Sequence, residues 1–318
     1  MIVISHEDIV NLNISPATCY KWAEEMIREK SKMMLPAKIS LKPMPGTFCN
    51  VMPCIVNRDS GKHIGGVKMV TRYPDRLPSL DSKALLFDAS NGDVLAFMDA
   101  NWITAMRTGA VAAHSIGLLA KSNFSNISIM GLGNTARATM LVLLSIYPEK
   151  NFRVKLLKYK GQEDSFVTRF ADFNNVTFEY ADTHEELIAG ADVLVSCVTY
   201  APVDFFEDEC FEKGILVVPV HTLGFTNCDL FFDKVYADDY DHVKGFKNFD
   251  KFRKFSEVSD VVNGRKTGRE NDEERIIAYN VGISIHDMFY AYNIWKLIME
   301  KNTICELDLK EPEEKFWI

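Results

Sequence analysis

The sequence predicts an α/β protein that combines a doubly wound parallel sheet with a second, α+β domain. Beyond residue 120, short apolar strands alternate with helical stretches, which is typical of a parallel sheet covered by helices on both faces. The first hundred residues instead hold several short β-like runs and a hairpin signal, as expected for an antiparallel sheet. A chain of 318 residues is long enough to bury two ordinary cores, so we expect two domains.

Composition and charge narrow the classes of partner. The chain is 47% hydrophobic and 25% charged, with a formal net charge of −8. This acidic balance offers no basic surface for nucleic acid or an anionic membrane, so a small-molecule partner is expected. No uninterrupted apolar stretch reaches the ~18 residues of a membrane span, and the first residues lack the pattern of a signal peptide. We expect a soluble protein that is not secreted.

The seven cysteines indicate the redox environment. Their number is odd and no C-x-x-C pair occurs, so neither a disulfide framework nor a zinc site is predicted. The histidines likewise form no pair with metal-ligand spacing, and we expect no metal site. Reduced thiols are usual in the cytoplasm, which is the expected location of the protein.

The first predicted element is an amphipathic helix over residues 17–33. Ser15 supplies its N-cap and Pro16 its first helical position. Prolines and a glycine then interrupt the chain between residues 36 and 46. Four β-like runs follow, at residues 48–56, 66–71, 84–87 and 94–98. Asn91-Gly92, between the last two runs, predicts a hairpin turn.

A second helix is predicted from residue 101 to 120, and its small side chains suit close packing against a neighbour or a ligand. Apolar strands then alternate with helices, at residues 127–130, 154–157, 176–180, 193–197, 215–220 and 235–237. Residues 245–272 are charged and interrupted by glycine, which predicts a long excursion. The last predicted helix, residues 286–300, is apolar on one face and is expected to return to the first domain.

A glycine turn directly follows the strand at residues 127–130. It reads Gly131-Leu132-Gly133-Asn134-Thr135-Ala136, the G-x-G-x-x-G/A pattern, and a helical run begins after it. The first glycine permits a tight turn, the second lets the backbone approach a pyrophosphate, and the helix N-terminus offers unpaired N–H groups to the phosphate. The pattern predicts a Rossmann-type dinucleotide domain. The alternative is a glycine turn that only joins a strand to a helix.

The end of the next strand bears on the choice of cofactor. An NAD-dependent enzyme usually places an acidic residue there for the ribose 2′-hydroxyl, whereas this chain has Leu157-Lys158-Tyr159-Lys160. Lys158 or Lys160 suits a 2′-phosphate, so the expected cofactor is NAD or NADP, with NADP favoured. The alternative is that both lysines face solvent, as most lysines do.

Several segments resemble one known family over most of the chain. Residues 98–110 read Met-Asp-Ala-Asn-Trp-Ile-Thr-Ala-Met-Arg-Thr-Gly-Ala, and the glycine turn follows at the family's spacing. Gly66-Val67-Lys68, residues 191–197, and Val281-Gly282 before Asp287 add to the match. Together they resemble the ornithine cyclodeaminase/mu-crystallin family, and the segment around Arg107 is the most specific of them.

The resemblance implies a homodimer whose chain forms two domains. Residues 1–110 and 284–318 are expected to form a substrate-binding and dimerisation domain, and residues 111–283 the Rossmann dinucleotide-binding domain. It also implies chemistry at the α-carbon C–N bond of a small amino or imino acid.

The resemblance leaves several activities open. One is cyclodeamination of ornithine or a related diamino acid, which releases ammonia without net use of cofactor. Another is oxidoreduction by an NADPH-dependent imine (ketimine) reductase or an opine-type amino-acid dehydrogenase. The alternative of another class is a non-catalytic, mu-crystallin-like protein that binds a dinucleotide or another ligand.

By similarity, two basic residues contact the substrate. Arg107 reaches the substrate carboxylate and the cofactor, which suits a guanidinium because its fork pairs both carboxylate oxygens. Lys68, in an otherwise apolar strand, binds the carboxylate or donates a proton to the departing nitrogen. The alternatives are an exposed helix charge for Arg107 and an outward-facing lysine for Lys68.

Two positions depart from the family pattern. Lys38 stands where the family usually has an arginine for the substrate carboxylate, and it offers a point charge in place of a bidentate clamp, with Lys42 as the alternative. His221 falls where ornithine cyclodeaminase has an aspartate that acts as acid and base. A histidine moves a proton near neutral pH but supplies no permanent negative charge for a distal ammonium, so ornithine is disfavoured. The alternative is a structural histidine that caps the strand.

The expected site therefore has a substrate side and a cofactor side. Val281 joins Lys38, Lys68 and Arg107 on the substrate side. The expected catalytic residues are Lys68 and His221. The residues expected at the cofactor are Ser79, Arg107, Gly131, Gly133, Asn134, Thr135, Ala136, Lys158, Cys197, Thr199, Val220 and Asn280.

Overall fold

The chain divides into two compact units. The computed structural model describes residues 1–57, 61, 63–199, 203–221, 225, 230–301, 305–308 and 314. The first unit consists of Met1–Asn13, Lys32–Ile103 and Asp287–Ile318, and the second of Ile14–Ser31 and Thr104–His286. Two helices contain unit boundaries, α3 (Asn101–Leu119) and α9 (Ser284–Met299).

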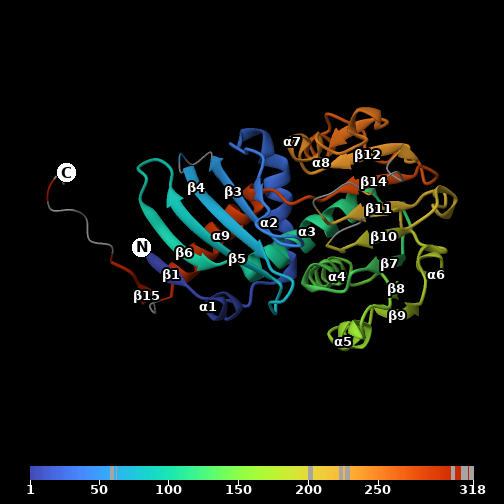
Figure 1. The fold of residues 1–318 in the computed structure, drawn as a ribbon, viewed down its shortest axis with the longest axis horizontal. Helices are drawn as coiled ribbons and strands as arrows, with labels where there is room; N and C mark the ends of the chain where they lie inside the picture. Colours follow the sequence, from blue (N-terminus) through green and yellow to red (C-terminus); the bar gives the residue numbers. More distant parts are fainter. Residues whose placement is uncertain are drawn as a thin grey trace. The chain divides into compact units, whose positions relative to one another are not determined.

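The first unit is built on a seven-stranded sheet. Its strands are β1 (Ile2–Ile4), β2 (Ile39–Leu41), β3 (Phe48–Asn57), β4 (His63–Arg72), β5 (Leu80–Asp88), β6 (Val94–Asp99) and β15 (Cys305–Glu306). Their order is β15-β1-β6-β5-β4-β3-β2 (Figure 1). Strands β3 to β6 correspond to the four predicted runs and pair antiparallel as expected, with Gly92 in the turn before β6. β2, which was not predicted, adds to them antiparallel to β3. β1 pairs with β6 in parallel, so the sheet is mixed.

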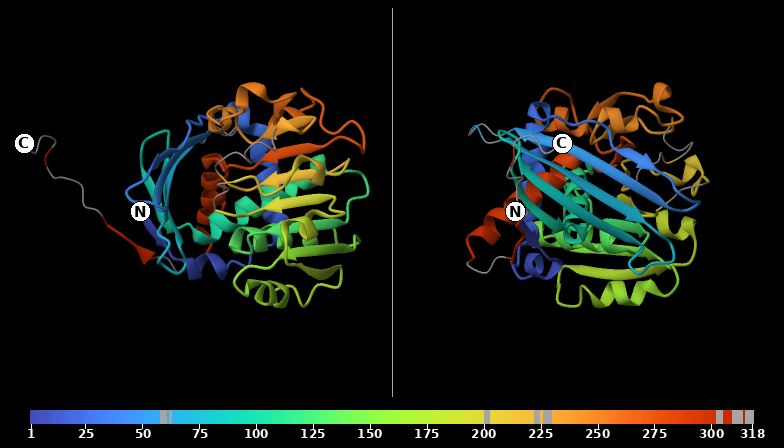
Figure 2. Two further views of the ribbon diagram at one scale, coloured as in Figure 1. Left: turned by 45° about the vertical axis from the view of Figure 1, so that its right-hand side comes forward. Right: turned by 60° about the vertical axis from the view of Figure 1, so that its left-hand side comes forward.

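Helix α9 lies along one face of this sheet, which we call the inner face (Figure 2). The contact is close because β4 has a glycine beneath the helix. A side chain on Gly66 would overlap Met288 of α9 and the carbonyl of Leu85. The helix therefore packs directly on the backbone of β4, and any larger residue at position 66 would separate the two elements.

The second unit contains an eight-stranded sheet. Its strands are β7 (Asn126–Met130), β8 (Phe152–Leu157), β9 (Val176–Ala181), β10 (Val193–Ser196), β11 (Leu216–Pro219), β12 (Lys234–Ala237), β13 (Phe255–Glu257) and β14 (Ile276–Tyr279). Their order is β13-β12-β14-β11-β10-β7-β8-β9, and every described pair is parallel. The run β9-β8-β7-β10-β11 has the Rossmann order, with its switch point between β7 and β10. The predicted doubly wound parallel sheet is confirmed.

The sequence prediction misses β14 and so is wrong about this end of the sheet. β14 inserts between β11 and β12 although it follows both in the chain. It is four residues long and comes directly after a charged stretch, which leaves little local signal. Residues 245–272, predicted as an excursion, also supply β13 to the sheet.

The helices not yet named are α1 (His6–Val10), α2 (Pro16–Glu29), α4 (Asn134–Ile146), α5 (Gln162–Thr168), α6 (His184–Ile188), α7 (Tyr240–Val243) and α8 (Val258–Val262). Helix α2 begins as predicted, since Ser15 Oγ accepts the N–H of Thr18. It packs against α4 and α8, and residues 14–31 therefore belong to the second unit. In this respect the units differ from the expected domain boundaries, which assigned the helix to the first domain.

Candidate functional site

The predicted glycine turn lies at the switch point of the second unit's sheet. Gly131 follows β7 and has a φ of +81°, a conformation that favours glycine. A side chain at this position would also overlap the backbone of Cys197 and Val198, which follow β10. Two constraints therefore require glycine here: the left-handed backbone and the close approach of the two chain segments.

The second glycine of the turn has a different environment. Gly133 is the N-cap of α4, and Asn134, Thr135 and Ala136 form the first turn of that helix. A Cβ built on Gly133 meets no atom within 4 Å, so packing inside the protein does not explain the glycine. Open space beside the unpaired N–H groups of a 13-residue helix fits a phosphate group.

Helix α3 is fixed against α4 by another glycine. A side chain on Gly109 would overlap the backbone of Ala138 and Thr139 in α4. The small residues that the sequence places around Arg107 therefore serve helix packing, and they set the position of α3 beside the glycine turn.

Other residues predicted at the cofactor follow neighbouring strands at the same edge of the sheet. Val220 follows β11, and its N–H donates to the Ser196 carbonyl at 2.8 Å. Asn280 follows β14, and its N–H donates to the Pro219 carbonyl at 2.9 Å. The Asn280 side-chain oxygen accepts a hydrogen bond of 3.1 Å from Ser115 of α3, a residue that the sequence analysis missed.

Cys197 and Thr199 follow β10 at this edge. The N–H of Cys197 donates to the Met130 carbonyl at 2.8 Å, which ties the end of β10 to the end of β7. Burial raises the pKa of the Cys197 thiol to about 12. The thiol is therefore protonated at neutral pH and is a poor nucleophile.

Lys158 follows β8 and forms an ion pair. Its Nζ lies 2.8 Å from Oδ1 of Asp182, which follows β9, and both side chains are exposed. The hydrogen bond to Asp182 raises the pKa of Lys158. The ammonium of Lys160 lies 5.1 Å from the centre of the Tyr159 ring. Asp182 was not among the residues predicted from the sequence.

Arg107 is 5% exposed, so it is no solvated helix charge. Its guanidinium lies against Gly282, whose φ is +78°. The contact is so close that a Cβ on Gly282 would overlap Arg107 Nη1. The N–H of Gly282 donates to Asp238 Oδ2 at 2.8 Å. Val281 is buried beside this turn. Asp238, which the sequence analysis missed, thus holds the turn that packs on the guanidinium.

Lys68 is fully buried on the inner face of the first unit's sheet, so it does not face outward. Its Nζ donates to Asp287 Oδ1 at 2.7 Å, and the carboxylate is also fully buried. The two residues come from β4 and α9, 219 positions apart. A buried ammonium needs such a partner because loss of water otherwise disfavours its charge. An aspartate in an apolar helix was the signal that would have marked Asp287 as a site residue.

Three further predicted residues lie beside the strands of the first unit. Lys38 directly precedes β2 and is half-buried, whereas Lys42 directly follows it and is exposed. Ser79 precedes β5 and is half-buried, and its carbonyl accepts the N–H of Tyr73 at 2.9 Å.

His221 follows β11, next to Val220, and is 6% exposed. Its ring centre lies 6.1 Å from that of Phe225. The predicted residues therefore form two groups. Lys38, Lys68 and Ser79 belong to the first unit, and all the others belong to the second, where most of them follow adjacent strands.

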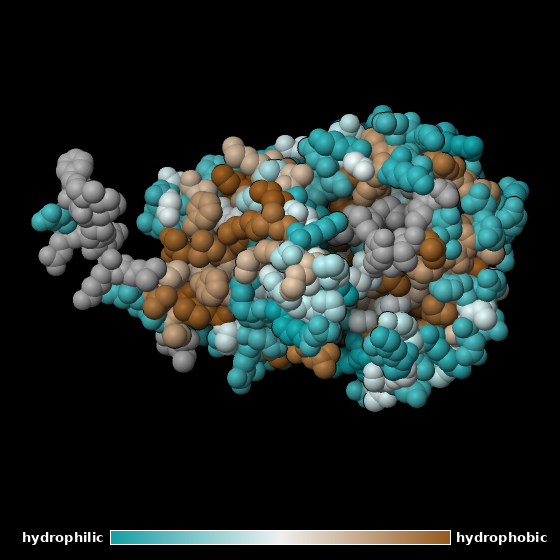
Figure 3. Space-filling model, viewed as in Figure 1, coloured by the Kyte–Doolittle hydropathy of each residue, from teal (hydrophilic) through white to brown (hydrophobic). Residues whose placement is uncertain are grey.

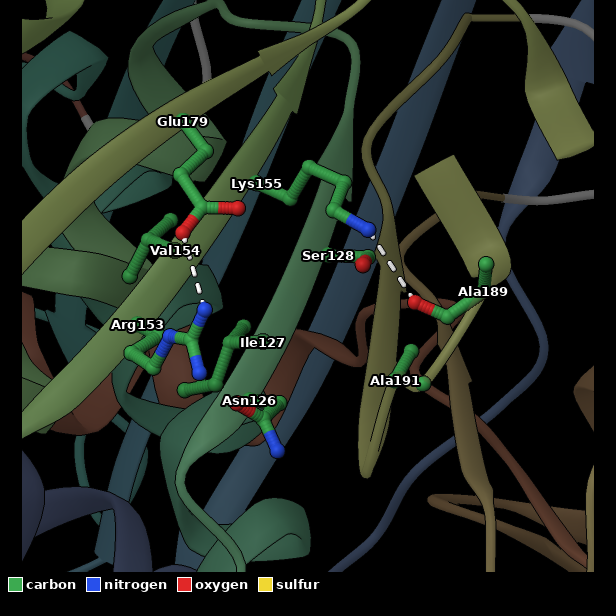
Figure 4. A pocket seen from close by; sticks show the side chains of 10 residues that line it. Asn126, Ile127, Ser128, Arg153, Val154, Lys155, Glu179, Ala189 and Ala191 are labelled. Atoms are coloured by element: carbon green, nitrogen blue, oxygen red, sulfur yellow. Dashed lines mark hydrogen bonds and ion pairs between the residues drawn. The ribbon is translucent and has the colours of Figure 1, made fainter. Parts of the chain in front are cut away.

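A cavity of about 280 Å³ lies elsewhere in the second unit, at the amino-terminal parts of β7 and β8 (Figure 4). Its charged side chains are already paired. Arg153 Nη2 lies 3.1 Å from Glu179 Oε1, and Lys155 Nζ donates to the Ala189 carbonyl at 3.0 Å. The glycine turn follows the opposite, carboxyl end of β7, so this cavity is not part of the predicted site.

Within the described residues, no group of three histidine, cysteine, aspartate or glutamate side chains is placed to hold a metal ion. Six cysteines are described and are free thiols, whereas Cys228 lies outside the described residues. No helix in the described part of the chain has the length and apolar character needed to cross a lipid bilayer.

Comparison with known proteins tests the resemblance drawn from Arg107, Lys68 and the glycine turn. Residues 2–302 match the ornithine cyclodeaminase/mu-crystallin family. The chain belongs to this family. The match covers nearly the whole chain and confirms the resemblance drawn from the sequence.

Known proteins are similar to this chain over most of their length. A nodulation efficiency protein of Rhizobium meliloti is 27% identical over 90% of this chain and 91% of its own. A Δ1-pyrroline-2-carboxylate reductase of Bacillus cereus is 25% identical over 95% of this chain and 98% of its own. The solved structure of an archaeal alanine dehydrogenase dimer with bound NAD has a TM-score of 0.83 at 23% identity, covering 98% of this chain and 99% of its own.

The Lys68–Asp287 pair of this family member makes a testable contribution to stability. Replacing Asp287 by alanine should lower the free energy of unfolding by about 3–5 kcal/mol, because the Lys68 ammonium then stays buried without this carboxylate. The double substitution Lys68→Met/Asp287→Leu should recover most of the loss, since it removes both charges. Urea denaturation followed by circular dichroism measures each variant.

The control is Asp241→Ala, which removes an exposed ion pair with Lys244 and should cost less than about 1 kcal/mol. If Asp287→Ala cost no more than this control, the Lys68–Asp287 pair would not be the buried interaction described above.

Proposed function

We propose that the chain is a nicotinamide-dependent oxidoreductase that acts on the α-carbon C–N bond of a small amino or imino acid. The observation that carries this proposal is the fully buried ion pair between Lys68 and Asp287. A charged lysine inside a protein is costly to build, and it suits the transfer of a proton to a substrate nitrogen. Membership of the family supports the same class of chemistry.

The glycine turn is our proposed site for the dinucleotide pyrophosphate. The open space at Gly133 and the N–H groups at the start of α4 support this assignment. When bound, the nicotinamide exchanges a hydride with the substrate. The further residues that we propose to contact the dinucleotide are Ser79, Arg107, Lys158, Cys197, Thr199, Val220 and Asn280.

The substrate carboxylate is proposed to bind Arg107. A guanidinium pairs both carboxylate oxygens, and the contact with the Gly282 turn limits the orientations that this side chain adopts. Lys38 and Val281 are proposed as further substrate contacts. Because Lys38 offers a point charge, it would add attraction for the carboxylate without fixing its plane.

Lys68 is proposed to donate the proton to the substrate nitrogen. In the reduction, a hydride adds to the α-carbon while a proton adds to nitrogen, so the C=N bond becomes an amine. Asp287 keeps the ammonium of Lys68 charged and in place until the proton is transferred. In the reverse direction the neutral lysine takes the proton back.

His221 favours reduction of an imino acid over cyclodeamination of ornithine. A histidine moves protons near neutral pH but offers no permanent negative charge to a second ammonium. The Bacillus cereus relative is named a Δ1-pyrroline-2-carboxylate reductase, which supports a cyclic imino acid as the substrate. Cyclodeamination and non-catalytic binding of a dinucleotide are the alternatives.

An assay at 340 nm tests this function. The protein should oxidise NADH or NADPH when Δ1-pyrroline-2-carboxylate is added. Lys68→Met should lower kcat by about 10²–10⁴-fold, because it removes the proton donor, while the dinucleotide still binds. The double variant Lys68→Met/Asp287→Leu should be equally inactive and guards against misfolding of the single variant.

The matched control is Lys83→Met, since Lys83 also pairs with aspartates, Asp81 and Asp99, but on the other face of the sheet. It should keep its turnover. Ammonia released from ornithine without net change in the cofactor would contradict the reductase. Unchanged turnover in the folded double variant would contradict the role of Lys68. Dinucleotide binding without turnover of any imino acid would favour the alternative of a non-catalytic, dinucleotide-binding protein.

We further propose that the chain forms a homodimer through the outer face of the first unit's sheet, opposite α9. Figure 3 shows apolar residues gathered over this unit. Val67, Leu85 and Phe97 stand side by side in the register of β4, β5 and β6, and Phe97 is 42% exposed. Contact with a second copy would remove this surface from water. The archaeal alanine dehydrogenase structure, which is a dimer, supports the proposal.

A charge on this face should prevent association. Phe97→Asp is expected to convert the dimer into a monomer of unchanged secondary structure, because the carboxylate would have to be desolvated in the interface. Light scattering after size-exclusion chromatography measures the mass. Val10→Asp, at a 46% exposed position on α1, is the matched control and should stay dimeric. A dimeric Phe97→Asp variant would refute this interface.

A further inference from the structure

A carboxylate stands beyond the end of β8, although the sequence has no acidic residue directly after that strand. Glu163, in the first turn of α5, reaches back, and its Oε2 accepts the N–H of Tyr159 at 3.3 Å. The last residue of β8 is Leu157. Glu163 therefore brings an acidic group to the backbone just beyond β8, the strand end near which an NAD-dependent Rossmann domain binds the ribose hydroxyls of adenosine.

The lysine at the same position is engaged by acidic neighbours. Lys158 Nζ lies 2.8 Å from Asp182 Oδ1. The N–H of Asp182 donates in turn to Glu186 Oε2 at 2.9 Å, which fixes the backbone next to the ion pair. The ends of β8 and β9 are in register, with Leu157 beside Ala181, so Lys158 and Asp182 leave the sheet side by side.

The local charge disfavours a further anion. Residues 158–164 and 182–186 contain two lysines and five carboxylates, so their formal charge is −3, and it is still −2 when Arg137, which reaches Ser165 of α5, is included. A phosphate monoester carries about −1.5 to −2 charges near neutral pH. A ribose with free hydroxyls is uncharged and donates hydrogen bonds, which a carboxylate accepts.

One side chain links the glycine turn to α5, the helix that carries Glu163. Arg137 of α4 donates through Nε to the Leu132 carbonyl in the turn, at 3.3 Å. Through Nη2 it donates to Ser165 Oγ of α5, at 2.8 Å. The glycine turn follows β7 and Lys158 follows β8, and these two strands are direct neighbours in the sheet. The proposed pyrophosphate site and the carboxylate of Glu163 therefore share one edge of the sheet.

We propose that Glu163 is a specificity-determining residue that selects NAD over NADP by accepting hydrogen bonds from the adenosine ribose. Asp182 acts with it by occupying Lys158, the residue that the sequence analysis assigned to a 2′-phosphate. This inference rests on the dinucleotide site proposed above. It reverses the expected preference for NADP, because the sequence alone does not show that Glu163 and Asp182 lie beside Lys158.

Calorimetric titration of the full chain with NADH and with NADPH, without substrate, tests the inference. The wild type should bind NADH at least tenfold more tightly. Glu163→Gln should weaken NADH binding and narrow the ratio of the two Kd values about tenfold. Asp182→Asn should strengthen NADPH binding by releasing Lys158. The double variant Glu163→Gln/Asp182→Asn should prefer NADPH. Glu179→Gln, an exposed carboxylate of β9 paired with Arg153, is the matched control and should leave the ratio unchanged.

Two kinds of failure are distinguishable. Tighter binding of NADPH by the wild type, or a ratio that the double variant moves less than twofold, would overturn this inference and leave the dinucleotide site standing. Binding of neither NADH nor NADPH would overturn the dinucleotide site itself and this inference with it.

Discussion

The first unit depends on the ion pair between Lys68 and Asp287. Both charges are fully buried, so each needs the other to offset the loss of water. The pair joins the middle of β4 to the start of α9, and Gly66 removes the side chain that would keep the helix away. The ion pair that is expected to stabilise the first unit is therefore also the pair to which we assign the proton transfer. An enzyme that must hold a proton donor away from water has to build its fold around that donor.

The second unit depends on backbone contacts at its switch point. Gly131 lets β7 and β10 end against each other, and Gly109 lets α3 lie on α4. Between these contacts, a Cβ built on Gly133, at the start of α4, would meet no atom within 4 Å. Arg107 lies on α3 and contacts the Gly282 turn, which Asp238 holds. The small residues are therefore a framework that fixes where the charged groups lie.

Local patterns predicted much of this, and long-range pairing explains what they missed. The glycine turn and most strands carry their own signals in spacing and residue type, and the small side chains of α3 indicated its close packing against a neighbour. β14 enters the sheet between strands that precede it, and β1 pairs in parallel with a distant strand, which no local pattern records. Asp182 lacked the same information, because it meets Lys158 only where the ends of β8 and β9 lie side by side. The proposed roles of Lys68 and His221 stay predictions.

The most direct test of the central claim follows the hydride itself. NADH that carries deuterium at the transferable C4 position is incubated with the protein and Δ1-pyrroline-2-carboxylate, and the product is examined by mass spectrometry and proton NMR. The account predicts one deuterium in each product molecule, bound to the α-carbon, with an unlabelled proton on nitrogen. A product without deuterium, or with deuterium at any other carbon, would contradict it.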